Sequence, residues 1–502
     1  MRAPRGGGAR LGGTPGGGAG RGRATGARGD GGRAAARAGA KLGQSARGVA
    51  LEVVRAVSRD DAYANLLLPS TISRARLSPA DAAFATELAY GTLRRRGLYD
   101  AIIVAASGRE LDAIDAVALD ILRLGAHQLV GMRTPAHAAV GETVELSRAV
   151  GAHRATGFLN AVLRRIATRS EGEWVAQLLA EHPGDDVDAR LATSTAHPVW
   201  VVAALRSALE REGRSDELGA LLEADNAAPR VSLVALPGLA EVPAEAERAR
   251  FSPVGLAAPS GDPAANPRVV AGVVRVQDEG SQLAALALSR ARPVEPGERW
   301  LDLCAGPGGK AALLAAEAAA GGAHLLANEV LPARAELVRR ALAPIDASIV
   351  VRAGDGRTIA AEHPVGFDRI LLDAPCTGLG ALRRRPEARW RKTAADVPEL
   401  ATLQSELLEA AIAALRPGGL LAYVTCSPHP AETTEVVERA LAAHPELEWL
   451  DTANVVQRVA REPLDLPDAP RLGGAVQLWP HRHGTDAMFI QLLTKPVATL
   501  QP

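Results

Sequence analysis

Two cysteines fifty residues apart are the most chemically suggestive residues of this sequence. Cys376 follows an apolar run in RILLDAPC, and Cys426 ends a second apolar run in LLAYVTC. Asp373 stands at the end of the first run. A thiolate can form a covalent intermediate, and a nearby carboxylate can hold a proton. Two thiols and an acid at the ends of two strands would suit nucleophilic catalysis, whereas an isolated cysteine such as Cys304 is expected to be a small buried residue.

Methylation of a pyrimidine ring needs this combination of groups. Carbon 5 of a pyrimidine is a poor nucleophile, so a thiolate must add to carbon 6 before carbon 5 can attack a methyl donor. Asp373 could hydrogen-bond the cytosine edge while electron density moves to ring nitrogen 3. Methyltransferases that act on amino groups carry Pro-Pro-aromatic after this acid, where the chain has Ala-Pro-Cys. The residues alone do not say which cysteine is the nucleophile.

A glycine-rich loop, LDLCAGPGGK at 301–310, precedes both thiols. Its glycines allow a sharp turn and a close approach of backbone to ligand, and a helix is expected to begin at Lys310. A phosphate-binding P-loop would need Gly at 304 and Ser or Thr at 311, where the chain has Cys304 and Ala311. The GxGxxG of dinucleotide-binding folds is also missing. The best remaining fit is the amino-acid part of S-adenosylmethionine (SAM).

The elements that must position these residues read as an α/β sheet. From Glu298 on, apolar strands alternate with helices, which predicts a doubly wound, Rossmann-like domain over 271–496 that ends in an antiparallel hairpin. Ligands bind at the carboxyl ends of such strands. Glu329 ends the second strand, where it suits the ribose hydroxyls of SAM, and Asp355 ends the third, on the adenine side.

The rest of the chain divides into three regions. Residues 1–46 hold eight Arg, one Lys and one Asp among many glycines, a net charge of +8. We expect a disordered arm, which is either an RNA contact or a solvated tail, the latter including a start codon placed too far upstream. Residues 47–169 show three- and four-residue apolar spacing, which predicts an all-α domain. Residues 170–270 predict a linker and a small α/β lobe.

Composition narrows the remaining classes. An apolar content of 47% is enough for buried hydrophobic cores. The sequence has no long uncharged apolar run, so we expect no membrane span. The three cysteines lack CxxC spacing, so we expect neither a disulfide framework nor a metal site, and a cytoplasmic location fits. We expect a monomer.

The motifs together resemble a known family. DAPCTGLGALRRRPEARW, YVTCSPHPAE, LDLCAGPGGK and VQDEGSQLAALAL are similar to the Sun family of RNA 5-methylcytosine methyltransferases, and within it to the RsmB-type bacterial 16S rRNA (cytosine-5)-methyltransferases. LRLGAHQLVGMRTPAHAAVGETVELSR and GFLNAVLRR resemble the NusB-type RNA-binding domain. The resemblance covers nearly the whole chain past residue 46. It implies a SAM-dependent enzyme that methylates carbon 5 of a cytosine in 16S rRNA, with RNA contacts from the helical domain and the small lobe.

The same resemblance implies roles for individual residues. Cys426 would form the adduct with carbon 6, and Cys376 would assist proton removal and enzyme release. The loop reads Ala-Gly-Pro where Ala-Ala-Pro is usual, and Glu329 stands where Asp is commoner, both of which preserve the chemistry. The small lobe has VALPG in place of the family's Arg-x-Asn, and HGTDAMF replaces Asp-Gly-Phe-Phe. The SAM-binding positions that carry over are Cys304, Ala305, Gly306, Pro307, Gly308, Gly309, Lys310, Glu329, Asp355 and Asp373.

Two questions stay open at this point. The run LRRRPEARWRK at 382–392 directly follows the Pro-Cys motif and sets Trp390 among cations, so we predict that it contacts the substrate backbone, the alternative being a solvated loop. The second class of function is a non-catalytic RNA-binding factor. The presence of Asp373, Cys376 and Cys426 argues against that class.

Overall fold

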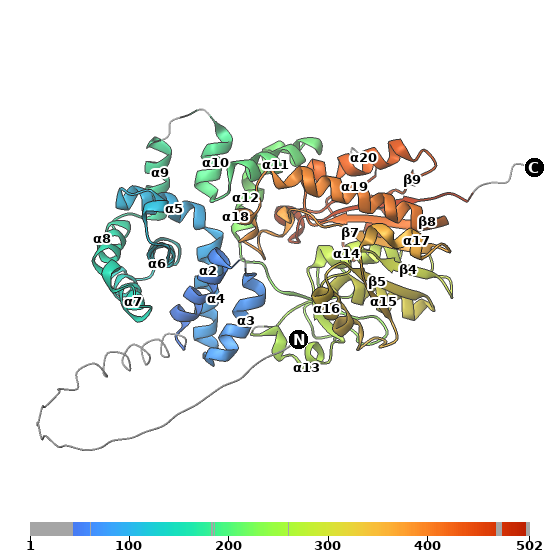
Figure 1. Cartoon of the computed structure of the whole chain (residues 1–502), viewed down its shortest axis with the longest axis horizontal. Helices are drawn as coiled ribbons and strands as arrows, with labels where there is room; N and C mark the ends of the chain where they lie inside the picture. The colour runs from blue at the N-terminus through green and yellow to red at the C-terminus, as the bar shows by residue number, and fades with distance from the viewer. Residues whose placement is uncertain are drawn as a thin grey trace, which may run out of the picture.

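The structure is a computed structural model of the whole chain, and it describes residues 44–60, 62–181, 184, 186–259, 261–467 and 474–497. The basic arm expected at 1–46 lies, apart from its last three residues, outside the described residues. A helical unit occupies one side of the molecule and an α/β unit the other (Figure 1). Among the described residues, no helix is both long and apolar enough to cross a bilayer.

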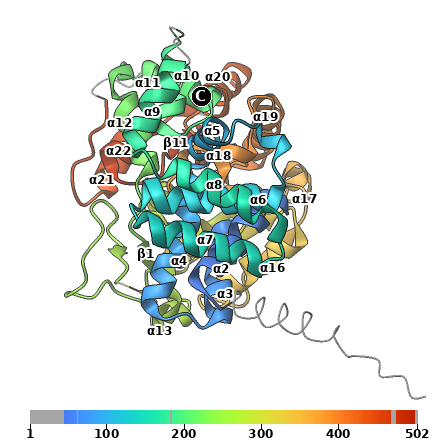
Figure 2. The same cartoon turned by 90° about the vertical axis from the view of Figure 1, so that its left-hand side faces the viewer.

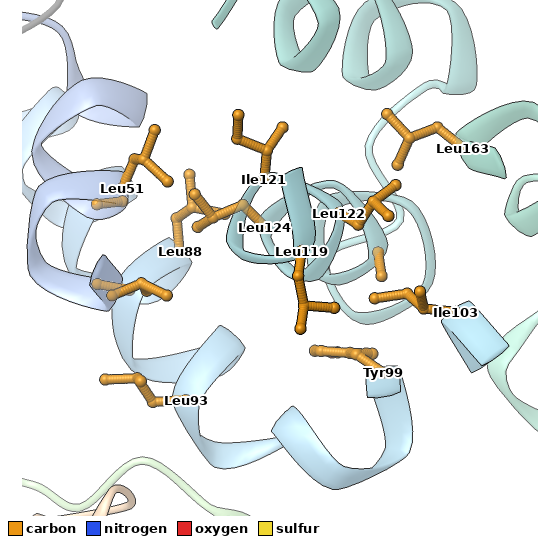
Figure 3. Close-up of a cluster of buried hydrophobic side chains, with 14 of the residues drawn as sticks. Leu51, Leu88, Leu93, Tyr99, Ile103, Leu119, Ile121, Leu122, Leu124 and Leu163 are labelled. Carbon is orange, nitrogen blue, oxygen red and sulfur yellow. The ribbon is translucent and has the colours of Figure 1, made fainter. Parts of the chain in front are cut away.

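The helical unit is a bundle, as predicted. Ser78 Oγ accepts a hydrogen bond from the Asp81 N–H at 3.1 Å and Pro79 follows it, so the cap and the fixed φ of proline start α4. The Asp115 carboxylate caps α6 in the same manner. Leucine and isoleucine side chains of the surrounding helices converge on α6 (Figure 3). The helices are α2 (Ala46–Arg59), α3 (Ala64–Ala75), α4 (Pro79–Arg94), α5 (Arg96–Ser107), α6 (Ala116–Ala126), α7 (Ala136–Ala149), α8 (Thr156–Ile166) and α9 (Glu171–Glu181).

Helix α9 belongs to the same core, although it follows the boundary that the sequence suggests at residue 169. Trp174 and Leu178 are buried in the bundle core, and the Trp174 indole N–H donates to the Ile166 carbonyl at 3.0 Å. The bundle helices lie in front of the sheet when the molecule is turned (Figure 2). The exact domain boundaries stay predictions.

A connecting region leads from the bundle to the large sheet. Its three helices share a core with Leu379, Leu382 and Trp479 of the α/β unit. A three-stranded antiparallel sheet of order β2-β1-β3 follows. The elements are α10 (Val187–Thr195), α11 (Val199–Arg211), α12 (Leu218–Asn226), β1 (Ser232–Ala235), β2 (Gly255–Ala257), α13 (Pro267–Val270) and β3 (Val274–Val276).

The α/β unit confirms the doubly wound fold. Its sheet has the order β10-β11-β8-β7-β4-β5-β6, with β9 paired to β11. Strands β4 to β8 are parallel, and β9, β10 and β11 add the predicted antiparallel end. The elements are α14 (Glu279–Ser289), β4 (Arg299–Asp302), α15 (Gly309–Gly321), β5 (His324–Glu329), α16 (Pro332–Leu342), β6 (Val350–Ala353), α17 (Ile359–Glu362), β7 (Phe367–Asp373), α18 (Ala388–Arg391), α19 (Asp396–Ala414), β8 (Leu415–Thr425), α20 (Thr434–Ala443), β9 (Glu448–Trp449), α21 (Thr452–Val459), β10 (Val476–Gln477), α22 (Pro480–His483) and β11 (Phe489–Thr494).

The segment 379–391, which follows the Pro-Cys motif, joins the α/β unit to the bundle. Arg389 is fully buried, and its guanidinium donates to the Arg94 carbonyl of α4, to the Ala196 carbonyl after α10 and to Asn226 Oδ1 of α12. The Trp390 indole N–H donates to the Leu93 carbonyl at 3.0 Å. The prediction that this run contacts substrate is therefore wrong for Arg389, because its guanidinium is fully buried between the bundle and the connecting helices.

Candidate active site

The two cysteines lie at the carboxyl ends of neighbouring parallel strands. β7 ends at Asp373 and β8 ends at Thr425, and Asp373 stands opposite Val424 in the register. Cys376 Sγ and Cys426 Sγ are 3.5 Å apart. The fold thus brings together the two thiols and the acid that the sequence singled out.

Different charges surround the two sulfurs. The hydrogen bond from the Cys376 thiol lowers the pKa of Cys426, and the positive charges of Lys310 and Arg385 act in the same direction. That hydrogen bond, burial and the negative charge of Glu432 raise the pKa of Cys376 well above its ordinary value. The surroundings of Cys426 therefore favour a negative charge more than those of Cys376 do.

Lys310 connects the glycine-rich loop to the end of β7. Its Nζ donates to Asp373 Oδ2 at 2.8 Å. Burial opposes the charge of the ammonium group, but the Asp373 carboxylate outweighs it, so the pKa of Lys310 is raised and the residue stays charged. The assignment of Lys310 to cofactor binding stays a prediction, and in the structure its ammonium group lies on Asp373, the predicted catalytic acid.

The glycine-rich loop needs its glycines for space. Gly308 has φ of 108°, and a Cβ there would lie 2.6 Å from Ala341 Cβ of α16. A Cβ on Gly306 would lie 2.0 Å from Glu329 Oε2. The two departures from the usual motif therefore belong together: the longer Glu329 occupies the place that an alanine methyl would take at 306.

Two buried polar side chains beside this loop lack a well-formed hydrogen bond among the described residues. Asp302, at the end of β4, is 1% exposed, and neither carboxylate oxygen accepts a hydrogen bond of ordinary geometry there, although the Cys304 N–H lies close enough to lower its pKa. Gln277, after β3, is 7% exposed with both amide atoms unpartnered, and its Cδ lies 4.0 Å from the position of a Gly309 Cβ. Buried polar groups are normally satisfied, so these atoms fit a bound molecule that carries an ammonium and a carboxylate group.

Sequence reasoning missed Asp302 and Gln277, although both stand in motifs that it quoted. Burial raises the pKa of Asp302 to about 8; the negative charge of Asp373 acts in the same direction, and Lys310 partly offsets both. An acid whose pKa lies this close to neutral pH can lose its proton when a cation binds beside it. The signal in the sequence was the polar residue at the end of each strand, LD before the loop and VQ before α14.

The remaining predicted positions line the same edge of the sheet with different accessibility. Glu329, at the end of β5, is buried, and its Oε1 accepts a hydrogen bond from the Leu331 N–H at 3.0 Å. Asp355, after β6, is more exposed, and Arg357 occupies both of its carboxylate oxygens. The hydrogen bond from Arg357 lowers the pKa of Asp355. Ala305 is buried, and burial raises the pKa of the Cys304 thiol well above its ordinary value, which fits a backbone role for both.

No metal centre is found in the described ranges, because no group of three or more His, Cys, Asp or Glu side chains there could hold an ion.

Glu432 lies behind the two thiols. It is fully buried and hydrogen-bonded to Thr377, which follows Cys376, and to Ser427, which follows Cys426. Sequence reasoning also missed Glu432.

A Rossmann-like sheet with a glycine-rich loop and paired thiols at its carboxyl edge defines a methyltransferase of the α/β class. Two family models match the chain: 16S rRNA methyltransferase RsmB/F over residues 291–494 and the NusB family over residues 44–168. The chain belongs to the RsmB/F family of 16S rRNA methyltransferases and carries a NusB-like helical domain in front.

Individual relatives support the same assignment. The Mycobacterium tuberculosis protein named "Putative methyltransferase Rv1407" is 48% identical over 90% of this chain and 96% of its own length. The ribosomal RNA small subunit methyltransferase B of Pseudomonas putida is 36% identical over 81% of this chain and 91% of its own length. Among solved structures, the crystal structure of PH0851 has a TM-score of 0.70 at 23% identity over 90% of this chain and 98% of that chain, which supports the fold.

Proposed function

We propose that this protein transfers a methyl group from SAM to carbon 5 of a cytosine in 16S rRNA through a covalent bond between Cys426 and carbon 6. The observation that carries the proposal is the pair of sulfurs 3.5 Å apart, with Lys310 and Arg385 on the side of Cys426. The family assignment supports an rRNA substrate. The target base must leave its helix to reach these sulfurs.

The side chains at the site would each act on one atom of the base. The Cys426 thiolate adds to carbon 6, and the displaced ring electrons move to nitrogen 3, which takes a proton through Asp373 from the Lys310 ammonium group bonded to it and returns that proton when carbon 5 attacks the methyl group. SAM, when bound, supplies the methyl group that carbon 5 attacks. Cys376 then assists removal of the carbon-5 proton, which passes to water, and release of the enzyme. The C–H electrons restore the C5–C6 double bond as the C6–S bond breaks, and Cys426 leaves as a thiolate.

The cofactor would lie along the carboxyl edge of β4, β5 and β6. We assign the loop Cys304 to Lys310 to its amino-acid end, Glu329 to its ribose and Asp355 to its adenine. Asp302 and Gln277, the two buried side chains without partners, suit the ammonium and carboxylate groups of the same end.

RNA binding would fall to the helical bundle at 47–169 and to the lobe at 170–270. The bundle matches the NusB family, and its α8 carries Arg164 and Arg165 on an exposed face. Arginines on such a face neutralise phosphates without reading sequence. The cytoplasmic location and the monomeric state stay predictions.

Covalent trapping tests the proposal. Purified Cys376→Ala protein, incubated with SAM and 16S rRNA, should accumulate a protein–RNA adduct on a denaturing gel, because the base would not be released. Cys426→Ala and the double variant Cys376→Ala/Cys426→Ala should form none. Bisulfite sequencing of 16S rRNA with and without the wild-type protein identifies the cytosine.

The opposite outcomes each have a meaning. An adduct in Cys426→Ala but not in Cys376→Ala would make the thiol of the Pro-Cys motif the nucleophile. A wild-type protein that shows no heat of SAM binding in calorimetry would instead be a non-catalytic RNA-binding factor.

A further inference from the structure

Glu432 occupies a buried position between the two loops that carry the thiols. It ends the short 3-10 helix Pro430–Glu432 and is fully buried. Its carboxylate accepts hydrogen bonds from the Thr377 N–H at 2.8 Å, from Thr377 Oγ1 at 2.5 Å and from Ser427 Oγ at 2.6 Å. Thr377 directly follows Cys376, and Ser427 directly follows Cys426. One carboxylate therefore holds both loops one residue away from each sulfur.

Neighbouring side chains fix Glu432 itself. Gln404 of α19 donates through Nε2 to Glu432 Oε1 at 3.1 Å and to the Pro375 carbonyl at 2.8 Å. The Tyr423 hydroxyl of β8 donates to the Glu432 carbonyl at 2.8 Å. These donors, like those of the two loops, are neutral groups, so the carboxylate is well solvated by hydrogen bonds while its charge is not cancelled by a cation in the same contacts.

We propose that Glu432 is a positioning residue that sets the distance between the two sulfurs and makes the surroundings of Cys376 more negative than those of Cys426. The inference rests on the proposed function, because it assigns the two thiols different roles in one reaction. Nothing in the proposed chemistry requires Glu432 to touch the substrate. It acts through Thr377 and Ser427.

The charges around the thiols support this division of roles. A buried negative charge disfavours a second negative charge nearby, so Glu432 opposes a thiolate at Cys376. The charged and titratable groups that face Cys376 are Glu432, Asp373 and Tyr423, and those that face Cys426 are Lys310, Arg385, Arg384 and Asp373. Asp373 acts on both sulfurs, whereas Glu432 on one side and the cations on the other make the two sulfurs differ.

The test uses Glu432→Gln in the full-length protein. The amide keeps the shape of the side chain but loses the charge and one acceptor. We expect kcat for methyl transfer to 16S rRNA to fall about 10²-fold, because a small displacement of reacting groups has an effect of that order. KM for SAM should stay within about twofold. The rate of alkylation of Cys376 by iodoacetamide, resolved from that of Cys426 by peptide mass spectrometry, should rise roughly tenfold relative to Cys426, because the thiolate is the species that reacts and the Glu432 charge that opposes it at Cys376 is gone.

Glu435→Gln is the matched control. Glu435 lies one turn further along, and its Oε1 accepts a hydrogen bond from Arg211 at 2.7 Å on a half-exposed surface. Neither kcat nor the alkylation ratio should change in this variant. If Glu432→Gln does not fold, Thr377→Val removes a single hydroxyl bond to the carboxylate, and we expect a fall in kcat of about tenfold with the alkylation ratio shifted in the same direction.

Two results would overturn the proposal. One is a kcat within about twofold of wild type in the folded variant, and the other is an equal change in the alkylation of both cysteines, which a general loosening of the site would produce. Methyl transfer by the wild-type protein tests the proposed function separately. If it is absent, the alkylation ratio still decides whether Glu432 sets the difference between the thiols.

Discussion

The two ends of strand β7 carry charged residues in opposite situations. Near the amino end, Arg369 is fully buried. It donates to Glu298 Oε2 at 2.8 Å, to Glu298 Oε1 at 3.2 Å and to four backbone carbonyls. Its guanidinium also lies 4.9 Å from the centre of the Trp300 ring. At the carboxyl end, Asp373 is partly accessible with one ion pair, to Lys310, and Asp302 beside it has no partner among the described residues.

The two ends of β7 therefore differ in whether the protein itself satisfies their polar groups. Arg369 uses its donors within the protein, so the amino end is finished by folding alone. The carboxyl end is left incomplete, and its unsatisfied atoms point to a ligand that completes it. Because parallel strands place all their carboxyl ends at one edge, Asp302 at the end of β4 and Asp373 at the end of β7 lie at one site.

The largest expected effect on stability comes from removing Arg369 near the amino end of β7. Arg369→Met leaves four buried carbonyls without this donor and leaves the Glu298 carboxylate with the Trp300 N–H but no cation, so the free energy of unfolding should fall by about 3–5 kcal/mol. Urea unfolding followed by circular dichroism measures it. Arg230→Met is the control, because Arg230 makes a similar two-bond pair with Glu247 on the exposed surface, where little change is expected. Equal losses in the two variants would contradict the comparison.

The sequence predicts the functional residues at the carboxyl end of β7 better than the buried contacts at its amino end. The motifs around Cys376, Cys426 and the glycine-rich loop are local and place their residues directly at strand ends. Their mutual distance follows from the order of the parallel strands, so the pair of thiols could be expected before the structure. The family resemblance, not the residues, ordered the two cysteines.

The contacts that sequence reasoning missed join segments far apart in the chain. Arg389 bonds to residues 193 and 295 positions away, and Arg369 to Glu298 71 positions away. A run of arginines predicts a cationic surface equally well whether its members face solvent, RNA or another domain. Glu432 was hidden for the same reason: one acid in a loop has no periodicity, and its meaning comes from Thr377, 55 residues earlier.

The second prediction concerns the protonation of Asp302 at the carboxyl end of β4. Burial raises the pKa of Asp302 to about 8 in the folded protein, well above the ordinary value of about 3.9 for an aspartate. Between these pH values the folded state holds a proton that the unfolded state has lost, so stability is present at low pH and is lost as pH rises towards 8, by up to about 1.4 kcal/mol per pH unit. Asp302→Asn should remove this slope.

Urea unfolding of both proteins at pH 6 and pH 8 measures the difference. The other buried acids with raised pKa values are the same in both proteins, so their contributions cancel; they are Asp120, Glu212, Asp225, Asp278 and Glu387. Parallel losses of stability in wild type and Asp302→Asn would show that this carboxyl is charged throughout. SAM should bind more tightly to wild type as pH rises through the same range, since its ammonium group favours the carboxylate.

The smallest effect should come from a single methyl group at the loop. Gly306 does not have a positive φ, so an alanine is allowed by the backbone, and its only obstacle is side-chain atoms at the carboxyl edge, above all Glu329 Oε2, 2.0 Å from the new Cβ. Gly306→Ala should therefore cost about 1–3 kcal/mol in stability or in the free energy of SAM binding, as overpacking does. Calorimetry and urea unfolding measure the two quantities.

Glu329→Asp in the same chain should restore most of that loss, because the shorter acid withdraws its carboxylate from the position of the methyl group. The two changes are therefore coupled, and a double-mutant cycle gives a favourable interaction energy between them. Gly308→Ala is the matched control: its φ of 108° and the backbone of Val338, 3.3 Å from the new Cβ, oppose a side chain, so Glu329→Asp cannot rescue it. Additive losses at 306 and 329 would mean that the two departures from the usual motif arose independently, and that the carboxyl edge does not adjust one residue to the size of another.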